Sequence, residues 1–325
     1  MQGWLVVPAI IFWHHVTILL RPGGMNSWRW TRVLLGYLIA IATIVLLVYT
    51  NLIRRFYKNT VPIVLGGIEA SLRRVTHYDY WTNKLRKPIL FDSKADIIVY
   101  GMGETALREL VHALDEGRDY RGIRGLCYIA KEPVEAYHQL PSHEECLKEK
   151  EKFIDLFDLF YDNNDPISAN GLCQKVDTRY SIQNPPCDYL DESEMDAVSA
   201  LPFTRELHPY HRPQGKVKCL ETIKFSIMTH QGCWGECNFC AIGVHQGRTI
   251  RTRSEASIVA EAKEFTTYKD FKGIISDVGG AQKAGLKGIL VKTGKYREEL
   301  AQRSEISPDA VIDSVADLPA LLTRF

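Results

Sequence analysis

The sequence predicts an α/β fold whose first folded part is a doubly wound parallel sheet. From residue 61 onward, apolar strands alternate with glycine turns and helices. The run at 61–67 ends in two glycines and leads into a helix, and the run at 95–100 precedes an amphipathic helix within 103–117. This alternation is typical of a parallel sheet that carries helices, and such sheets bind ligands at the glycine-rich ends of their strands.

Composition limits the classes of partner. The chain has 325 residues, of which 46% are hydrophobic and 24% charged, and its formal net charge is +1. It can therefore bury two ordinary cores, and it has no overall charge that would attract nucleic acid or an anionic membrane. Its eight cysteines show no disulfide framework, because three share one loop and the other five are scattered. A reducing cytoplasm is the expected location.

The first 50 residues form a separate hydrophobic segment. Residues 33–50 are an uncharged run of 18, bounded by Arg32 on one side and by Arg54 and Arg55 on the other. About 20 apolar residues span a bilayer, so this run is a candidate transmembrane helix and membrane anchoring is an alternative location. The competing interpretation is that residues 43–50 form a buried parallel strand.

The most informative motif is a run of three cysteines. Cys233, Cys237 and Cys240 follow the spacing C-x3-C-x2-C on one short loop. Three thiolates suit a [4Fe-4S] cluster, because each holds one iron and the fourth iron stays open for another ligand. The alternative is a zinc site, with a fourth ligand taken from the following three residues: His230, His245 or Cys219.

This spacing is the pattern of radical S-adenosylmethionine (SAM) enzymes, and from 51 to 280 the chain resembles the YgiQ-like radical SAM proteins. The likeness rests on VPIVLGGIEASLRR, HYDYW, ADIIVYGMGE, NDPISANGL, the long stretch into the cysteine run, and FKGIISDVGG. It implies that SAM binds the open iron of a [4Fe-4S] cluster, and that an electron from the cluster splits SAM into a 5′-deoxyadenosyl radical. The reductant would be a protein such as flavodoxin or ferredoxin.

The resemblance also implies a domain order. Residues 51–130 would be a doubly wound domain similar to the cobalamin-binding-like domain of many radical SAM proteins, and 131–215 a connector. Residues 216–280 would begin a partial radical SAM (β/α) barrel, with a strand at 222–229 and a helix at 255–265 that Ser254 caps. Residues 281–325 would be a separate tail.

The same resemblance supplies candidate SAM ligands. Asp277, Gly279 and Gly280 occupy the place of the glycine pair that meets the SAM amino group in this family. Arg248 and Arg253 are candidates for the SAM carboxylate, because a guanidinium binds a carboxylate through two parallel hydrogen bonds.

At Gly280 the likeness changes. Residues 277–325 resemble the C-terminal end of haloacid-dehalogenase-type phosphatases, in the letters DVGGAQ and TGKYR. The chain lacks the Asp-x-Asp nucleophile strand that such phosphatases use. The predicted function is therefore an iron–sulfur radical SAM protein that cleaves SAM reductively on an unknown substrate. The alternatives are a phosphatase fragment, a non-catalytic metal-binding protein and a membrane-anchored protein.

Overall fold

The chain is described as two compact units. The computed structural model describes residues 6–7, 46–57, 61–80, 82–209, 211–215, 217, 220, 224–235, 237, 240–271, 289–291 and 308–313. The first unit comprises Met1–Leu190 and Gln231–Arg251, and the second comprises Asp191–His230 and Thr252–Phe325.

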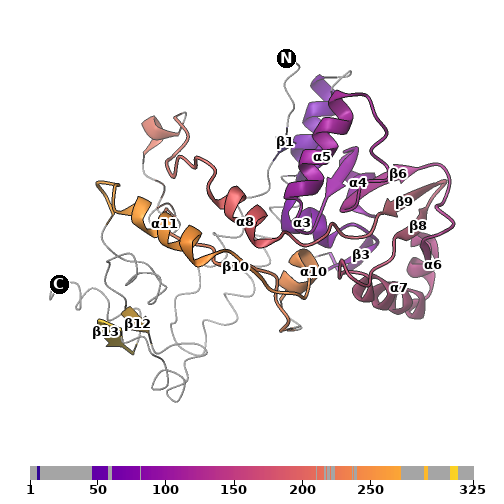
Figure 1. Ribbon diagram of the computed structural model, residues 1–325. Coiled ribbons are helices and arrows are strands. Elements are labelled where there is room, and N and C mark those ends of the chain that lie inside the picture. The colour runs from indigo at the N-terminus through magenta and orange to yellow at the C-terminus, as the bar shows by residue number, and fades with distance from the viewer. Residues whose placement is uncertain are drawn as a thin grey trace. The chain divides into compact units, whose positions relative to one another are not determined.

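The first unit contains a mixed seven-stranded sheet (Figure 1). Its strands, in spatial order, are β1 (Val6–Val7), β2 (Val64–Leu65), β5 (Ile97–Val99), β6 (Leu126–Ala130), β9 (Arg179–Gln183), β8 (Leu172–Val176) and β7 (His138–Leu140). β1, β2 and β5 are parallel, and β7 is parallel to β8. The β5–β6, β6–β9 and β8–β9 pairs are antiparallel. The predicted α/β class is confirmed. The sheet, however, is mixed and not purely parallel as predicted.

The β8–β9 hairpin lies within 131–215, where the sequence predicted only a connector. Its two strands are joined at Asp177 and Thr178, and Asp177 has a φ of 54°. A tight hairpin turn needs positive φ, which asparagine, aspartate and glycine tolerate. Asp-Thr is a weaker turn signal than Asn-Gly, so the local pattern did not reveal the hairpin.

Helices cover both faces of the parallel strands, because neighbouring residues of a strand point to opposite faces. Leu65 and Ile98 are fully buried in one core with α3 (Gly67–Leu72), α4 (Ile89–Ser93) and Leu46. Val64 and Ile97 belong to the other core, which α5 (Glu104–Asp115) covers. The predicted periodicity of α5 is confirmed by its buried residues: Ala106, Leu110 and Ala113.

Two further helices pack beside β7 and β8. They are α6 (His143–Lys148), which begins with a capping box between Ser142 and Glu145, and α7 (Lys150–Asp162). Glu149 separates the two helices, because its backbone is extended, with φ −128° and ψ 118°. The end of α7 brings the 161–166 segment next to the cysteine loop described below.

The hydrophobic N-terminal run is described only at its end. Within the described part of the chain, no helix is long and apolar enough to cross a membrane. Residues 46–56 are helical, so the alternative prediction of a strand over 43–50 is wrong for residues 46–50. The Thr50 hydroxyl donates to the Leu46 carbonyl at 2.7 Å, as it does along a helix. Residues 33–45, most of the predicted span, lie outside the described residues.

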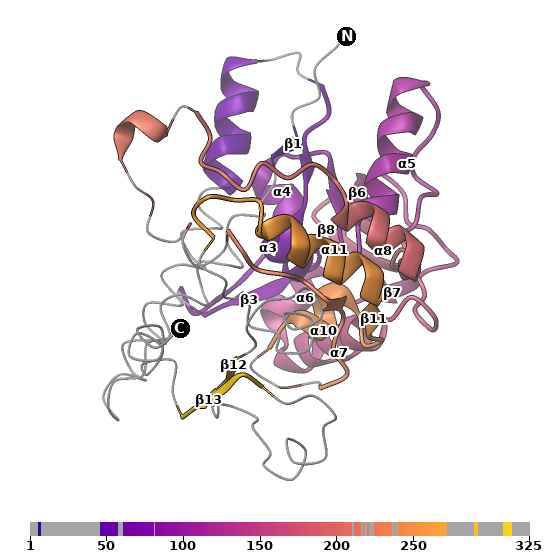
Figure 2. The ribbon, with the colours of Figure 1, turned by 60° about the vertical axis from the view of Figure 1, so that its left-hand side comes forward.

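The second unit contains α8 (Glu192–Ser199), η2 (Arg212–Gln214) and α11 (Glu255–Phe265). Ser254 caps α11 as predicted, because its hydroxyl accepts a hydrogen bond from the Ser257 backbone N–H at 3.1 Å. In the tail, β12 (Ile289–Val291) and β13 (Ala310–Ile312) form a parallel pair, visible side by side in Figures 1 and 2.

The predicted strand at 222–229 requires a correction. Residues 224–229 form no strand. The short strand β10 (His230–Gln231) follows them directly and pairs with β11 (Arg251–Thr252). The alternating Phe225 and Ile227 instead pack against the apolar face of α11. Alternation predicts one buried face, and here a helix covers that face without a sheet partner.

Candidate functional site

The cysteine run lies on a loop that is closed at its base. The loop leaves β10 and ends in α10 (Ile242–Gln246). The Cys233 backbone N–H donates to the Gly247 carbonyl at 3.2 Å, and the Gly232 N–H donates to the Gln246 side-chain oxygen at 3.1 Å. These two contacts hold the start and the end of the loop together.

Two of the three thiols, those of Cys233 and Cys237, contact the backbone of Gly235. The Gly235 N–H donates to the Cys233 sulfur at 3.4 Å, and the Cys237 thiol donates to the Gly235 carbonyl at 3.5 Å. The Cys240 N–H donates to the Cys237 carbonyl at 2.8 Å. Cys237 is exposed, whereas Cys233 and Cys240 are partly buried, and all three are free thiols. The exposed Cys237 thiol is thus accessible to a metal from solvent.

All three cysteines line one pocket. The other residues that line it are Tyr161, Asn164, Gly243, Val244 and Arg248. Across the described ranges, no three His, Cys, Asp or Glu side chains converge to hold a single metal ion. A [4Fe-4S] cluster does not need such convergence, because each cysteine binds a different iron. Three thiols that line one pocket are a donor set that suits an iron–sulfur cluster.

The candidate fourth ligands of a zinc site have other contacts. His245 lies in α10, where its Nδ1 is 2.9 Å from the Ser71 hydroxyl of α3. Burial, with a smaller contribution from Arg74, lowers the pKa of His245 to about 4. The Nδ1 of His230 is 2.9 Å from the Thr229 hydroxyl. Cys219 lies outside the described residues.

Of the two arginines predicted to bind the SAM carboxylate, Arg248 lines the cysteine pocket. Its guanidinium lies over the Tyr161 ring, 4.5 Å from the ring centroid, and donates to the Tyr161 carbonyl at 3.2 Å. Asp277, Gly279 and Gly280 lie outside the described residues.

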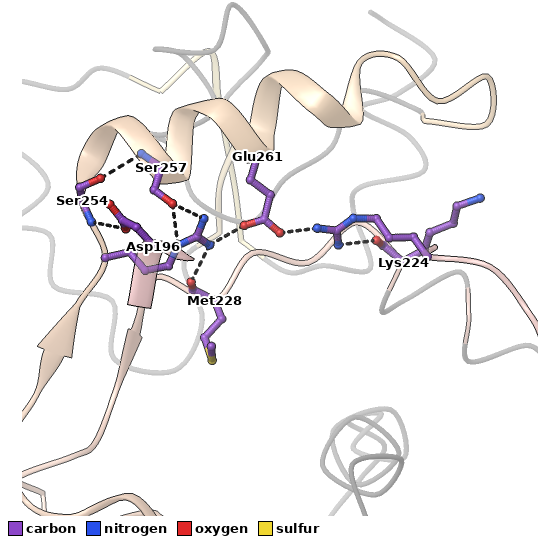
Figure 3. A network of polar contacts seen from close by, with 8 residues as sticks. Asp196, Lys224, Met228, Ser254, Ser257 and Glu261 are labelled. Atoms are coloured by element: carbon purple, nitrogen blue, oxygen red, sulfur yellow. Dashed lines mark hydrogen bonds and ion pairs between the residues drawn. The ribbon is translucent and has the colours of Figure 1, made fainter. Parts of the chain in front are cut away.

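Arg253 has a structural environment in the second unit. Its side chain is only 2% exposed and pairs with Glu261, which also pairs with Arg205 at 2.5 Å. It donates further to the Ser257 hydroxyl at 2.8 Å and to the Met228 carbonyl at 3.1 Å (Figure 3). These contacts join α11 to the segment that precedes β10, which is a sufficient reason for an arginine here.

The segment after α7 forms one wall of the cysteine pocket, and sequence reasoning gave it no role. Asn164 donates to the Phe160 carbonyl at 2.6 Å and accepts from Arg74 at 2.7 Å. Its neighbour Asp165 accepts from the Tyr189 hydroxyl at 2.8 Å, which in turn accepts from the Thr249 N–H at 3.2 Å. The available signal was the NDPISANGL stretch, which contributed to the family resemblance.

A second, smaller pocket lies at the carboxyl end of β5. It is lined by residues that include Tyr100, Gly101, Asn164, Tyr189 and His245. Gly101 has a φ of 77°, which favours glycine, and a Cβ there would lie 3.8 Å from the His245 carbonyl. The glycine-rich edge of the sheet therefore supports α10, the helix that follows the cysteines.

Comparison with known proteins identifies two families along the chain. The family described as Radical SAM N-terminal matches residues 42–226, and the family described as HAD-hydrolase-like matches residues 274–318. A UPF0313 protein of Fusobacterium nucleatum subsp. nucleatum is 55% identical over 272 residues, which are 83% of this chain and 46% of the relative. A UPF0313 protein of Thermotoga maritima is 46% identical over 262 residues, which are 80% of this chain and 44% of the relative.

A solved structure is also similar. It is TsrM, a radical S-adenosylmethionine methyltransferase from Kitasatospora setae with tryptophan and a SAM analogue bound. The identity is 17% and the TM-score 0.41, over 81% of this chain and 42% of TsrM.

The family matches more than half of the chain. The chain belongs to the Radical SAM N-terminal family and is a YgiQ-like radical SAM protein, with a HAD-hydrolase-like segment near its C-terminus. It spans less than half the length of the curated relatives it matches.

Proposed function

We propose that this chain binds a [4Fe-4S] cluster through Cys233, Cys237 and Cys240 and takes part in the reductive cleavage of SAM. The observation that carries the proposal is the set of three free thiols that line one pocket beside Arg248. When bound, such a cluster supplies the electron that breaks a carbon–sulfur bond of SAM. The substrate is not assigned, and the electron would come from a small redox protein of the flavodoxin or ferredoxin type.

The chain's own residues would position the ligands. The hydrogen bonds at Gly232 and Gly247 close the loop base, so less conformational entropy is lost when the three thiols bind iron. Arg248, held over Tyr161, would bind the SAM carboxylate through its guanidinium. On the family resemblance, Asp277, Gly279 and Gly280 would complete the SAM site.

The test is anaerobic reconstitution with iron and sulfide, followed by iron and sulfide counting and electron paramagnetic resonance with and without SAM. We expect about four irons per chain and a spectrum that changes when SAM is added. A cluster whose spectrum does not change when SAM is added would indicate a non-catalytic metal-binding protein. Zinc without iron uptake would refute the proposal.

Cysteine substitutions sharpen this test. Cys237→Ala should abolish cluster assembly, because it removes one of three thiolate ligands. The matched control is Cys146→Ala, which should keep the iron content of the wild type. Cys146 is buried in a hydrophobic core, and burial raises the pKa of its thiol to about 11. If the two variants lost iron equally, the ligand assignment would be wrong.

A further inference from the structure

Arg74 is a charged side chain that is completely buried in the first unit, with a relative exposure of 0%. Its guanidinium lies between two aromatic rings, 3.9 Å from the centroid of Tyr100 and 4.8 Å from that of Phe160. Its Nε donates to the Ser71 carbonyl at 2.6 Å, and one terminal nitrogen donates to the Asn164 side-chain oxygen at 2.7 Å.

The positive charge of Arg74 has no negative partner among the residues that the structure describes. The hydrogen-bond acceptors named above are neutral amide oxygens, and its Nη1 is buried without a hydrogen-bond partner. Burial lowers the pKa of Arg74, yet a guanidinium stays protonated in proteins. An uncompensated buried charge is unfavourable, and the cost falls when an anion binds nearby.

The contacts of Arg74 belong to the cysteine site. Asn164, its hydrogen-bond partner, lines the pocket that contains Cys233, Cys237 and Cys240. Ser71, its other acceptor, hydrogen-bonds through its hydroxyl to His245 of α10, the helix that follows the cysteines. Arg74 therefore contacts the lining of the cysteine pocket from behind, through Asn164.

We infer that Arg74 is the counter-charge of the iron–sulfur cluster and that it raises the cluster's reduction potential. This inference rests on the proposed function, since it requires three thiolates and a cluster at the cysteine loop. A fixed positive charge in a low-dielectric interior favours whichever state of the cluster is more negative. Reduction adds one electron from an external reductant, so Arg74 stabilises the reduced state and eases that step. Arg74 acts here as a positioning and tuning residue and touches no reacting atom.

The test measures the midpoint potential of the reconstituted full chain. The potential is followed by electron paramagnetic resonance during titration with dithionite under anaerobic conditions. Arg74→Met fills a similar volume without a charge, and we expect its cluster to have a more negative midpoint potential than the wild type. The charge-matched control is Arg108→Gln on the exposed face of α5, where solvent screens the lost charge and no shift is expected.

A second variant keeps the test decisive if Arg74→Met does not fold. In Arg74→Lys the charge is retained, but a buried lysine releases its proton far more readily than an arginine. As pH rises through the lysine pKa, the midpoint potential of Arg74→Lys should therefore become more negative. This decrease should come on top of any pH dependence that the wild-type potential shows. Circular dichroism at each pH verifies that the fold is retained.

The outcomes separate the two proposals. A wild-type chain that takes up no cluster would refute the proposed function, and the inference about Arg74 would be refuted with it. Full clusters in the wild type and in Arg74→Met with equal midpoint potentials would refute only the inference. So would an Arg74→Lys chain whose potential follows pH as the wild type does. Either result would assign Arg74 to packing alone.

Discussion

The base of the cysteine loop depends on a glycine that no other residue can replace without strain. Gly247 ends α10 with a φ of 88° and a ψ of 173°, a backbone region that is populated essentially by glycine alone. A Cβ at this position would lie 2.5 Å from the hydroxyl oxygen of Tyr189. Gly247→Ala therefore forces a change in the backbone, in Tyr189, or in both.

The expected cost follows from these contacts. A residue with a Cβ pays about 1 to 3 kcal/mol in this backbone region. Displacing Tyr189 also disturbs its hydrogen bonds to Asp165 and Thr249, each worth about 0.5 to 1.5 kcal/mol. We expect Gly247→Ala to lower the free energy of unfolding by about 2 to 6 kcal/mol. Iron uptake should fall as well, because the Gly247 carbonyl holds the Cys233 N–H.

The assay is urea unfolding followed by circular dichroism, with iron content measured after reconstitution. Gly117→Ala is the matched control, because Gly117 has a φ of 66° and a Cβ there would meet nothing within 4 Å. It should cost about 1 to 2 kcal/mol and leave iron uptake unchanged. In a Tyr189→Ala background, Gly247→Ala should cost only the backbone part. A Gly247→Ala protein as stable as the wild type, with full iron content, would refute this account of the loop.

Two further predictions concern charge and pH. Glu261→Gln removes the counter-charge that Arg253 and Arg205 share, and it should lower the stability of the second unit by about 3 kcal/mol. The control is Glu264→Gln at an exposed position of the same helix, which should change the midpoint of urea unfolding little. Equal midpoints for the two variants would contradict the network in Figure 3. Burial lowers the pKa of His245 to about 4. As pH falls below about 6.5, the histidine therefore takes up a proton in the unfolded chain but not in the folded chain. The free energy of unfolding should fall by up to about 3 kcal/mol by pH 4. His245→Asn should make the free energy of unfolding depend less on pH in this window, and an unchanged pH profile would show that His245 is accessible to protons in the folded state.

Local sequence patterns determined several elements of this protein. The 3.6-residue periodicity of α5 placed Ala106 and Leu110 in the core, and the Ser254 hydroxyl fixed the start of α11. Glycines after apolar runs marked the ends of β2 and β5. The three cysteines of one loop were identified by spacing alone. These signals act over a few residues, so they can be interpreted without the rest of the fold.

Only the tertiary structure decided the partners of these elements. The direction of β6 against β5, the break of the α6–α7 segment at Glu149 and the helix at 46–50 depend on packing, which no local pattern encodes. The wall of the cysteine pocket joins Arg74 to Asn164, 90 residues apart in the sequence. The sequence determined where the three closely spaced thiols lie along the chain. Long-range packing determined which charges surround them, because a buried charge acts on whatever the fold brings beside it.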